Sequence, residues 1–276
     1  MPTVSFAKAP LVELIAEFRW IPKDVAGTIT AQEPQTVQQP TFFIGPPRFE
    51  EFYMCLGAEL YKVGFNRSER LIQPNFPVPL HQAVYRFRSD ASAKTASVLF
   101  QVGPGIFSVH GVPPYKSWET FLPFVRMGIE ALLKCRDQVL KKESLTQVIL
   151  RYIDFFSDDL TQGKGVTSFM TEVLGISTTL PRAVMDVSTA KEPSSLFSKF
   201  VIPVKTGTLA VAAGDGKFNN QYGIVLDTAV TAEQGLPSDS DGLLGMLDSA
   251  HEIIRSTFLG MTKPIERLMQ PQGDSN

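Results

Sequence analysis

The chain contains few of the residues that most often form metal sites, disulfides or reactive nucleophiles. Its 276 residues include only two cysteines and three histidines. No Cys-x-x-Cys pair occurs, and the histidines do not follow the His-Glu-x-x-His spacing of zinc enzymes. We therefore expect no metal ion and no cofactor. Cys55 and Cys135 lie in apolar helical patterns, which indicate two buried thiols rather than a disulfide.

Charge of one sign and long apolar runs are also scarce. The formal net charge is −2, so the chain lacks the overall basic character of most proteins that bind nucleic acids or anionic membranes. This net charge is still compatible with a local basic patch. No apolar run approaches the length that crosses a bilayer, and residues 1–8 show no leader pattern. These patterns predict a cytoplasmic protein without a membrane partner.

Two short motifs suggest chemistry but fit structural roles better. Gly214-Asp215-Gly216-Lys217 lacks the spacing and the following helix of a phosphate-binding loop, so we predict a hairpin turn there. Asp154, Asp158 and Asp159 cluster at the end of an apolar stretch and offer oxygen ligands for a divalent cation, but such clusters more often solvate a turn. Because no Gly-x-Ser-x-Gly motif occurs either, the sequence favours a protein that is not an enzyme.

Alternating polarity predicts a half-buried strand over residues 11–20, with Glu13, Glu17 and Arg19 among the residues on its polar side. Residues 21–40 are polar and show no periodicity, which indicates a long exposed connection. The other elements predicted in the first half are a helix over 46–63, strands over 81–89, 95–102 and 106–110 with a tight turn at 103–105, and a helix over 117–139.

The second half shows a similar order of patterns. An apolar strand over 147–156 precedes a short helix that ends at Gly175. Asp239 or Asp241 is a good N-terminal cap for a long final helix that reaches residue 261. The strands predicted between these two helices cover residues 183–187, 196–203, 208–213 and 222–228.

Each half of the chain therefore runs through strand, helix, several antiparallel strands and long helix. This order predicts an α+β fold with a duplicated unit, residues 1–143 and 144–270, merged into one domain and followed by a disordered tail at 271–276. Alternating strands need one covered face, so we expect a curved antiparallel sheet with the long helices across its buried side.

Arginines on strands are the first candidates for binding. Arg19, Arg86 and Arg88 are expected on the sheet face opposite the core, where guanidinium groups bind phosphate or carboxylate in a forked geometry. The structural alternative is cross-strand pairing with glutamates such as Glu17. Arg151 lies in an apolar strand, where a charge requires a partner.

A second candidate site combines Arg151, Tyr152 and His110 between the sheet and a long helix, where they would bind a nucleotide or another small ligand. An enzyme would need a cluster assembled from distant residues, such as His110 near Asp154. Residues 261–269 continue past the last helical stripe and offer a surface on which a second subunit could dock.

Several motifs resemble an uncharacterised, sporadically distributed prokaryotic protein family of about this length. The resemblance rests on residues 9–20, 100–105 and 151–156, on Tyr115 with Trp118 and Phe121, and on His251 with Phe258 and Thr262. Asp154 stands where the family ends this strand with Asn. The family carries no assigned activity, and its sporadic occurrence implies mobile genes and hence phage defence, toxin neutralisation or a similar accessory task.

The sequence thus favours a non-enzymatic protein that recognises another macromolecule, most simply a protein, in an accessory or defence system. A sensor of a nucleotide or small ligand is the first alternative, and an uncharacterised enzyme is the second. Because loops as long as residues 21–40 often carry function, we expect deletion of this segment to leave folding intact and to abolish partner capture.

Overall fold

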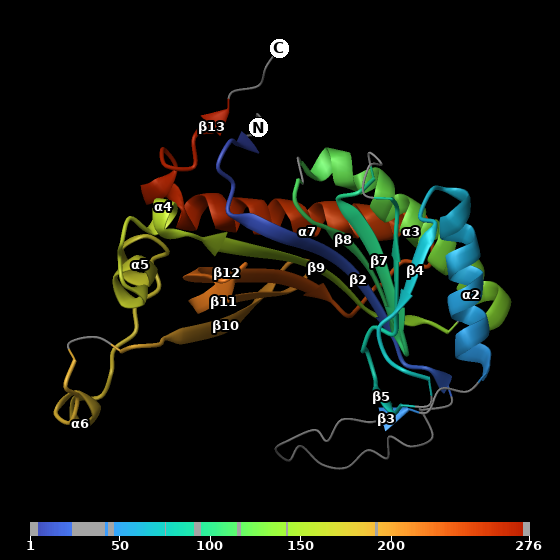
Figure 1. The fold of residues 1–276 in the computed structure, drawn as a ribbon, viewed down its shortest axis with the longest axis horizontal. Helices are drawn as coiled ribbons and strands as arrows, with labels where there is room; N and C mark the ends of the chain where they lie inside the picture. Colours follow the sequence, from blue (N-terminus) through green and yellow to red (C-terminus); the bar gives the residue numbers. More distant parts are fainter. Residues whose placement is uncertain are drawn as a thin grey trace. The chain divides into compact units, whose positions relative to one another are not determined.

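The computed structural model describes residues 5–23, 42–43, 47–74, 76–90, 95–114, 117–141, 143–190 and 193–272 (Figure 1). Over these residues the chain is an α+β protein with a nine-stranded antiparallel sheet of order β10-β11-β12-β9-β2-β8-β7-β6-β4. The predicted fold class is therefore confirmed, whereas the internal duplication stays a prediction. The strands of this sheet are β2 (Leu11–Trp20), β4 (Arg67–Arg70), β6 (Tyr85–Arg88), β7 (Val98–Gly103), β8 (Ile106–Gly111), β9 (Leu145–Phe156), β10 (Phe197–Val204), β11 (Gly207–Phe218) and β12 (Gln221–Ala232).

Helices and two small strand pairs complete the described elements. No helix within the described ranges has the length and apolar character that a bilayer span needs. The pairs are β1 (Ser5–Phe6) with β13 (Pro271–Gln272) and β3 (Phe42–Phe43) with β5 (Val78–Pro79). The helices are α2 (Pro47–Lys62), α3 (Trp118–Val139), α4 (Asp158–Thr161), α5 (Val166–Glu172), α6 (Arg182–Met185), α7 (Ser240–Met261) and the 3-10 turn η1 (Lys263–Ile265).

The chain forms two compact units, and each combines segments from distant parts of the sequence. Unit 1 consists of Met1–Glu13, Arg151–Val230 and Ala250–Asn276, whereas unit 2 consists of Leu14–Leu150 and Thr231–Ser249. The long elements β2, β9, β12 and α7 contribute residues to both units. The division of the chain at residue 143 stays a prediction about sequence halves.

Unit 2 has an aromatic core between its strands and the helices α2 and α3. Phe18 and Phe107 face each other across β2 and β8 with ring centroids 6.2 Å apart. Phe65, which follows α2, meets Phe100 of β7 edge to face at 4.6 Å. Gly128 allows α3 to approach this layer, because a Cβ there would lie 2.8 Å from the Phe100 ring. The predicted cap of α3 is confirmed as a reciprocal capping box between Ser117 and Thr120.

The turn between β7 and β8 requires both of its glycines. Gly105 has φ +70°, which disfavours any residue with a Cβ. A Cβ on Gly103 would lie 1.8 Å from the carbonyl oxygen of Gln82. Trp20 donates its backbone N–H to the Gly105 carbonyl at 3.0 Å, and His81 donates its own to the Pro104 carbonyl at 2.8 Å. The turn is therefore held by close backbone packing.

Unit 1 covers β9 and β11 with short helices and with the last turns of α7. Phe156 at the end of β9 packs on Phe169 of α5, with ring centroids 5.1 Å apart. Leu209 and Val211 of β11 are buried. Gly175 has φ +70° just after α5, as expected for a residue that ends a helix. The start of α7 belongs to unit 2, and there the Asp239 carboxylate accepts the Gly242 N–H at 2.9 Å, so Asp239 rather than Asp241 caps this helix.

Three predictions in unit 1 were wrong. Residues 214–216 lie inside β11, and the hairpin turns at Asn219 and Asn220, which have φ +47° and +64°. Residues 183–187 were predicted as a strand, but α6 occupies 182–185. Pro271 and Gln272 were assigned to a disordered tail, but they form β13.

In unit 2 the strand predicted over 81–89 is limited to β6, and β4 was not predicted at all. Cys135 is buried as expected, whereas Cys55 is only half-buried. Burial and a hydrogen bond to Cys55 raise the pKa of the Cys135 thiol, so this sulfur stays protonated at neutral pH. Most of the segment 21–40 lies outside the described residues.

Candidate functional site

The side of unit 2's strands that points away from α2 and α3 carries a set of polar side chains, which we call the polar face. Directly paired residues of antiparallel strands point to the same side, so the strand register assigns each residue to a face. Arg19, Arg86, Arg88 and His110 all lie on the polar face. One row across it runs through Glu17, Ser108, Gln101, Arg86 and Glu69, and the next through Ile15, His110, Leu99, Arg88 and Arg67.

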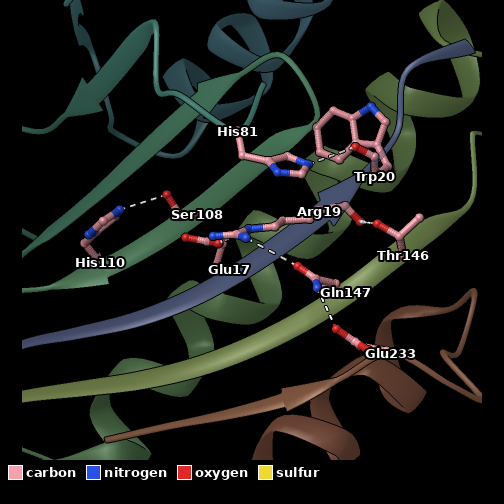
Figure 2. Close-up of polar contacts among 9 residues, drawn as sticks. All are labelled: Glu17, Arg19, Trp20, His81, Ser108, His110, Thr146, Gln147 and Glu233. Atoms are coloured by element: carbon pink, nitrogen blue, oxygen red, sulfur yellow. Dashed lines mark hydrogen bonds and ion pairs between the residues drawn. The ribbon is translucent and has the colours of Figure 1, made fainter. Parts of the chain in front are cut away.

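Arg19 is the centre of a hydrogen-bonded chain on the polar face (Figure 2). Its Nε donates to the Glu17 carboxylate, and its Nη1 donates to the Gln147 side-chain oxygen at 3.3 Å. Gln147 in turn donates its Nε2 to Glu233 at 2.7 Å. The side chains of Arg19 and Glu17 are 31% and 17% exposed. A partly exposed guanidinium is thus held in place by two acceptors and paired with one carboxylate.

His81 lies beside this chain in an unusual backbone conformation. Its φ is +64°, a left-handed value that non-glycine residues adopt rarely. The ring Nε2 lies 3.3 Å from the carbonyl oxygen of Trp20, and Figure 2 shows the imidazole above Arg19. Burial, followed by the positive charge of Arg19, lowers the pKa of His81. The imidazole is therefore neutral at neutral pH and acts as a polar group without charge.

His110 is a buried residue of the polar face. Its Nε2 lies 2.8 Å from the Ser108 hydroxyl, and both residues are buried. The register places Ser108 opposite Glu17 and His110 opposite Ile15. His110 is therefore a buried component of the polar face, and its imidazole is not presented to solvent.

The other two arginines of the polar face differ from each other. Arg86 pairs with Glu69 at 3.3 Å. With its amide oxygen turned toward Arg86, Gln101 also accepts from Nε and Nη2 at 3.2 and 3.3 Å. Arg88 is exposed. Cross-strand pairing with a glutamate, the structural alternative for these arginines, thus describes Arg86. Arg19 instead pairs with Glu17 along the same strand, and its cross-strand partner is Gln147.

Unit 1 contains the remaining predicted site residues. Arg151 pairs with Asp227, and its Nε donates to the carboxylate at 2.7 Å, which provides the partner that its apolar strand requires. The Tyr152 hydroxyl lies 2.6 Å from Nδ1 of His251. Arg151 and Tyr152 thus belong to a different unit from Arg19, Arg86, Arg88 and His110.

Asp154 is a buried carboxyl in unit 1. It alternates along β9 with Phe156, so both side chains point to the covered side of the strand. Burial, with a smaller contribution from the negative charge of Asp227, raises the pKa of Asp154 to about 8. The group therefore carries a proton at neutral pH. Asp158 and Asp159 begin α4 on the surface, and no cluster of three metal-ligating side chains occurs among the described residues.

Sequence patterns missed several residues on or beside the polar face, namely His81, Ser108, Gln147 and Glu233. Gln147 was placed in a predicted strand, and its polar side chain among apolar neighbours was a usable signal. Ser108 and His81 needed the strand register and the turn geometry. Glu233 follows β12, and only the folded chain brings it to Gln147.

Comparison of the chain with protein-family models, with curated proteins and with solved structures found no match. The resemblance in residues 9–20, 100–105 and 151–156 therefore remains a prediction.

Proposed function

We propose that the protein is a non-enzymatic recognition protein and that the polar face of unit 2 binds a protein partner. The accessory, defence or toxin-neutralising role implied by the resemblance belongs to the same proposal. The observation that carries it is the Arg19 chain, in which a partly exposed arginine is fixed by Glu17 and Gln147. Fixed, partly exposed polar groups lose little conformational entropy when a partner binds.

The charge balance of the polar face favours a protein over a nucleic acid. Glu17 compensates Arg19, and Glu69 compensates Arg86. A nucleic acid is bound by cationic side chains that neutralise its phosphates. On the polar face, the neighbouring carboxylates would compete with the phosphates for the arginines. Protein interfaces, in contrast, combine paired charges with hydrogen bonds at a polar rim.

The test compares charge variants as bait for partner capture from the source cells. Arg19→Glu reverses the central charge, and we expect it to lose the proteins that the wild-type chain enriches. The double variant Glu17→Arg with Arg19→Glu restores an internal ion pair in reversed order. It should fold as the wild type does and still fail to bind.

The matched control is Arg182→Glu, which reverses an exposed charge in unit 1 away from β10 and should keep the partner. Urea denaturation of every variant separates a loss of recognition from a loss of folding. Retention of the same partners by Arg19→Glu at full strength would contradict the proposal.

A small-ligand sensor is the second candidate, and the position of His81 favours it. A neutral imidazole in a rare backbone conformation lies beside Arg19, and such conformations cluster at binding sites. A ligand phosphate or carboxylate would replace Gln147 as an acceptor for Arg19. A thermal-shift screen with nucleotides tests this, because ligands that bind the native state raise the melting temperature, and Arg19→Ala should remove the shift.

A further inference from the structure

Strand β10 is the end strand of the sheet and is unusually apolar for an exposed element. It pairs with β11 along its whole length, and no described strand lies on its other side. Phe197 is 70% exposed, Phe200 39%, Val201 56% and Ile202 45%. An eight-residue strand with apolar side chains on both faces therefore borders solvent.

The backbone of β10 presents an open row of hydrogen-bonding groups. The Leu196 carbonyl, just before the strand, accepts the Asp215 N–H of β11. Successive residues of an antiparallel strand point these groups alternately to the two sides. The backbone groups of Phe200 and Ile202 therefore bond to β11. The carbonyls that point outward belong to the alternate residues, Phe197, Lys199, Val201 and Pro203. Each of these except Pro203 also points a backbone N–H outward.

Proteins normally protect such edges with charges, prolines or a short strand. Here β10 has one charged residue, Lys199, and one proline, Pro203. The backbone of Pro203 faces outward, so it offers the edge a carbonyl but no N–H. An open apolar edge favours aggregation from the moment the chain folds. The backbone groups of β10 are therefore best paired by a partner that is always present. A second copy of the same chain is present wherever the protein is made.

We propose that β10 pairs antiparallel with β10 of a second copy, so that the twofold axis passes at Phe200. In this register, Lys199 and the second copy's Val201 exchange both backbone hydrogen bonds, and Val201 does the same with the second copy's Lys199. The Phe197 N–H donates to the second copy's Pro203 carbonyl. The two Phe200 rings meet across the axis and contribute an aromatic pair.

The two neighbouring registers are less favourable. An axis at Lys199 places two ammonium groups directly opposite each other, which destabilises a strand pair. An axis at Val201 places Lys199 opposite the second copy's Pro203, which lacks an N–H, and moves Phe197 beyond the end of the partner strand. The axis at Phe200 satisfies the most backbone groups without opposing charges.

The first experiment measures the mass of the full chain by sedimentation over a concentration series. The wild type should sediment as a dimer, and Val201→Pro should sediment as a single chain at the same concentrations, because proline removes an outward N–H that β11 does not use. Val201→Thr keeps the N–H and the branched shape, so it should remain dimeric. Circular dichroism and urea denaturation show whether Val201→Pro is folded.

The second experiment tests the register by cross-linking. Phe200→Cys places two thiols at a directly opposed, non-hydrogen-bonded pair, where Cα atoms are about 4.5 Å apart and a disulfide fits. Ser198→Cys is the matched control, since its two copies are separated by four positions along the strands. The first variant should form a covalent dimer under mild oxidation, and the second and the wild type should not.

A wild-type chain that sediments as a monomer throughout, or a dimer that Val201→Pro leaves intact, would overturn the proposal. A monomer whose β10 amides become protected from hydrogen exchange only when another protein is added would also overturn it, in favour of a different occupant. A folded Val201→Pro monomer together with the Phe200→Cys cross-link supports the second copy.

Discussion

The covered sides of the strands differ between the two units. In unit 2, they are apolar, with Phe18, Phe100 and Phe107 buried against α2 and α3 and the charges kept on the polar face. In unit 1, the covered sides of β9 and β12 include Asp154 and Thr228, both buried. Unit 2 does bury charged groups, such as Arg136 of α3 and Glu143, but they lie outside its strands. The covered side of its strands is thus stabilised by aromatic packing, whereas the covered side of the strands in unit 1 contains polar groups, one of them a carboxyl that keeps its proton.

The largest effect on stability should come from removing an aromatic ring from the core of unit 2. Phe100→Ala removes a fully buried ring that packs on Phe65 and Phe107, and it leaves a cavity. We expect a loss of about 3–5 kcal/mol in the free energy of unfolding, measured by urea denaturation. Tyr222→Ala removes an aromatic ring that is 76% exposed and should change it by less than about 1 kcal/mol. Similar losses in both variants would contradict this account of unit 2.

The next effect comes from removing the buried carboxyl of unit 1. Asp154→Asn keeps the shape and cannot ionise, so it should stabilise the protein at pH 8 by several kcal/mol, because each unit of pKa shift is worth about 1.4 kcal/mol. In the wild type, the folded-state pKa of Asp154 is about 8, against an ordinary value of 3.8. Between these two pH values, the unfolded chain has lost a proton that the folded chain keeps. The contribution of Asp154 to stability therefore falls as pH rises through this window.

Urea denaturation of wild type and Asp154→Asn at several pH values between 4 and 8 measures this slope. The two curves should converge near pH 4 and separate with rising pH. Asp186→Asn, which changes an exposed carboxylate of unit 1, serves as the control and should run parallel to the wild type. Parallel curves for Asp154→Asn as well would show that Asp154 ionises normally in the folded protein.

Sequence patterns predicted unit 2 well where one face of each strand is uniformly apolar. Alternation placed Glu17 and Arg19 opposite Phe18, and the register bears this out. It also placed Arg86 and Arg88 together opposite Phe87. The pairing of Arg19 with Gln147 could not be predicted, because it depends on which strands are neighbours and on their register. These are tertiary properties that local periodicity does not contain.

In unit 1, the same kind of signal had a different physical cause. Gly214-Asp215-Gly216 resembles a turn, but these glycines lie within a strand because their neighbours leave no room for a Cβ. A Cβ on Gly214 would lie 2.5 Å from the Leu196 carbonyl, and one on Gly216 would lie 2.5 Å from a Val225 methyl. Glycine occurs where two segments of the backbone approach closely as well as in tight turns, and the sequence alone does not distinguish the two cases. The run at 183–187 was too short to distinguish helix from strand.

A smaller gain should follow from the second buried polar group of unit 1. The Thr228 hydroxyl is buried and has no hydrogen-bond partner within the described part of the chain. Thr228→Val replaces it with a methyl of the same shape, so the free energy of unfolding should rise by about 1 kcal/mol. Thr146→Val is the matched control in unit 2. Its hydroxyl donates to the Arg19 carbonyl at 3.3 Å, so the same replacement should lower stability there by up to about 1 kcal/mol.

The smallest effect on stability should come from the polar face itself. Glu17→Gln removes the charge that compensates Arg19 but keeps an acceptor of the same length. Because partly exposed ion pairs contribute little, the free energy of unfolding should change by less than about 1 kcal/mol, and less again in high salt. The same variant leaves Arg19 uncompensated, so partner capture should change far more than stability does. If stability fell as far as in Phe100→Ala, the polar face would be part of the folding core, and the contrast between the two sides of unit 2 would disappear.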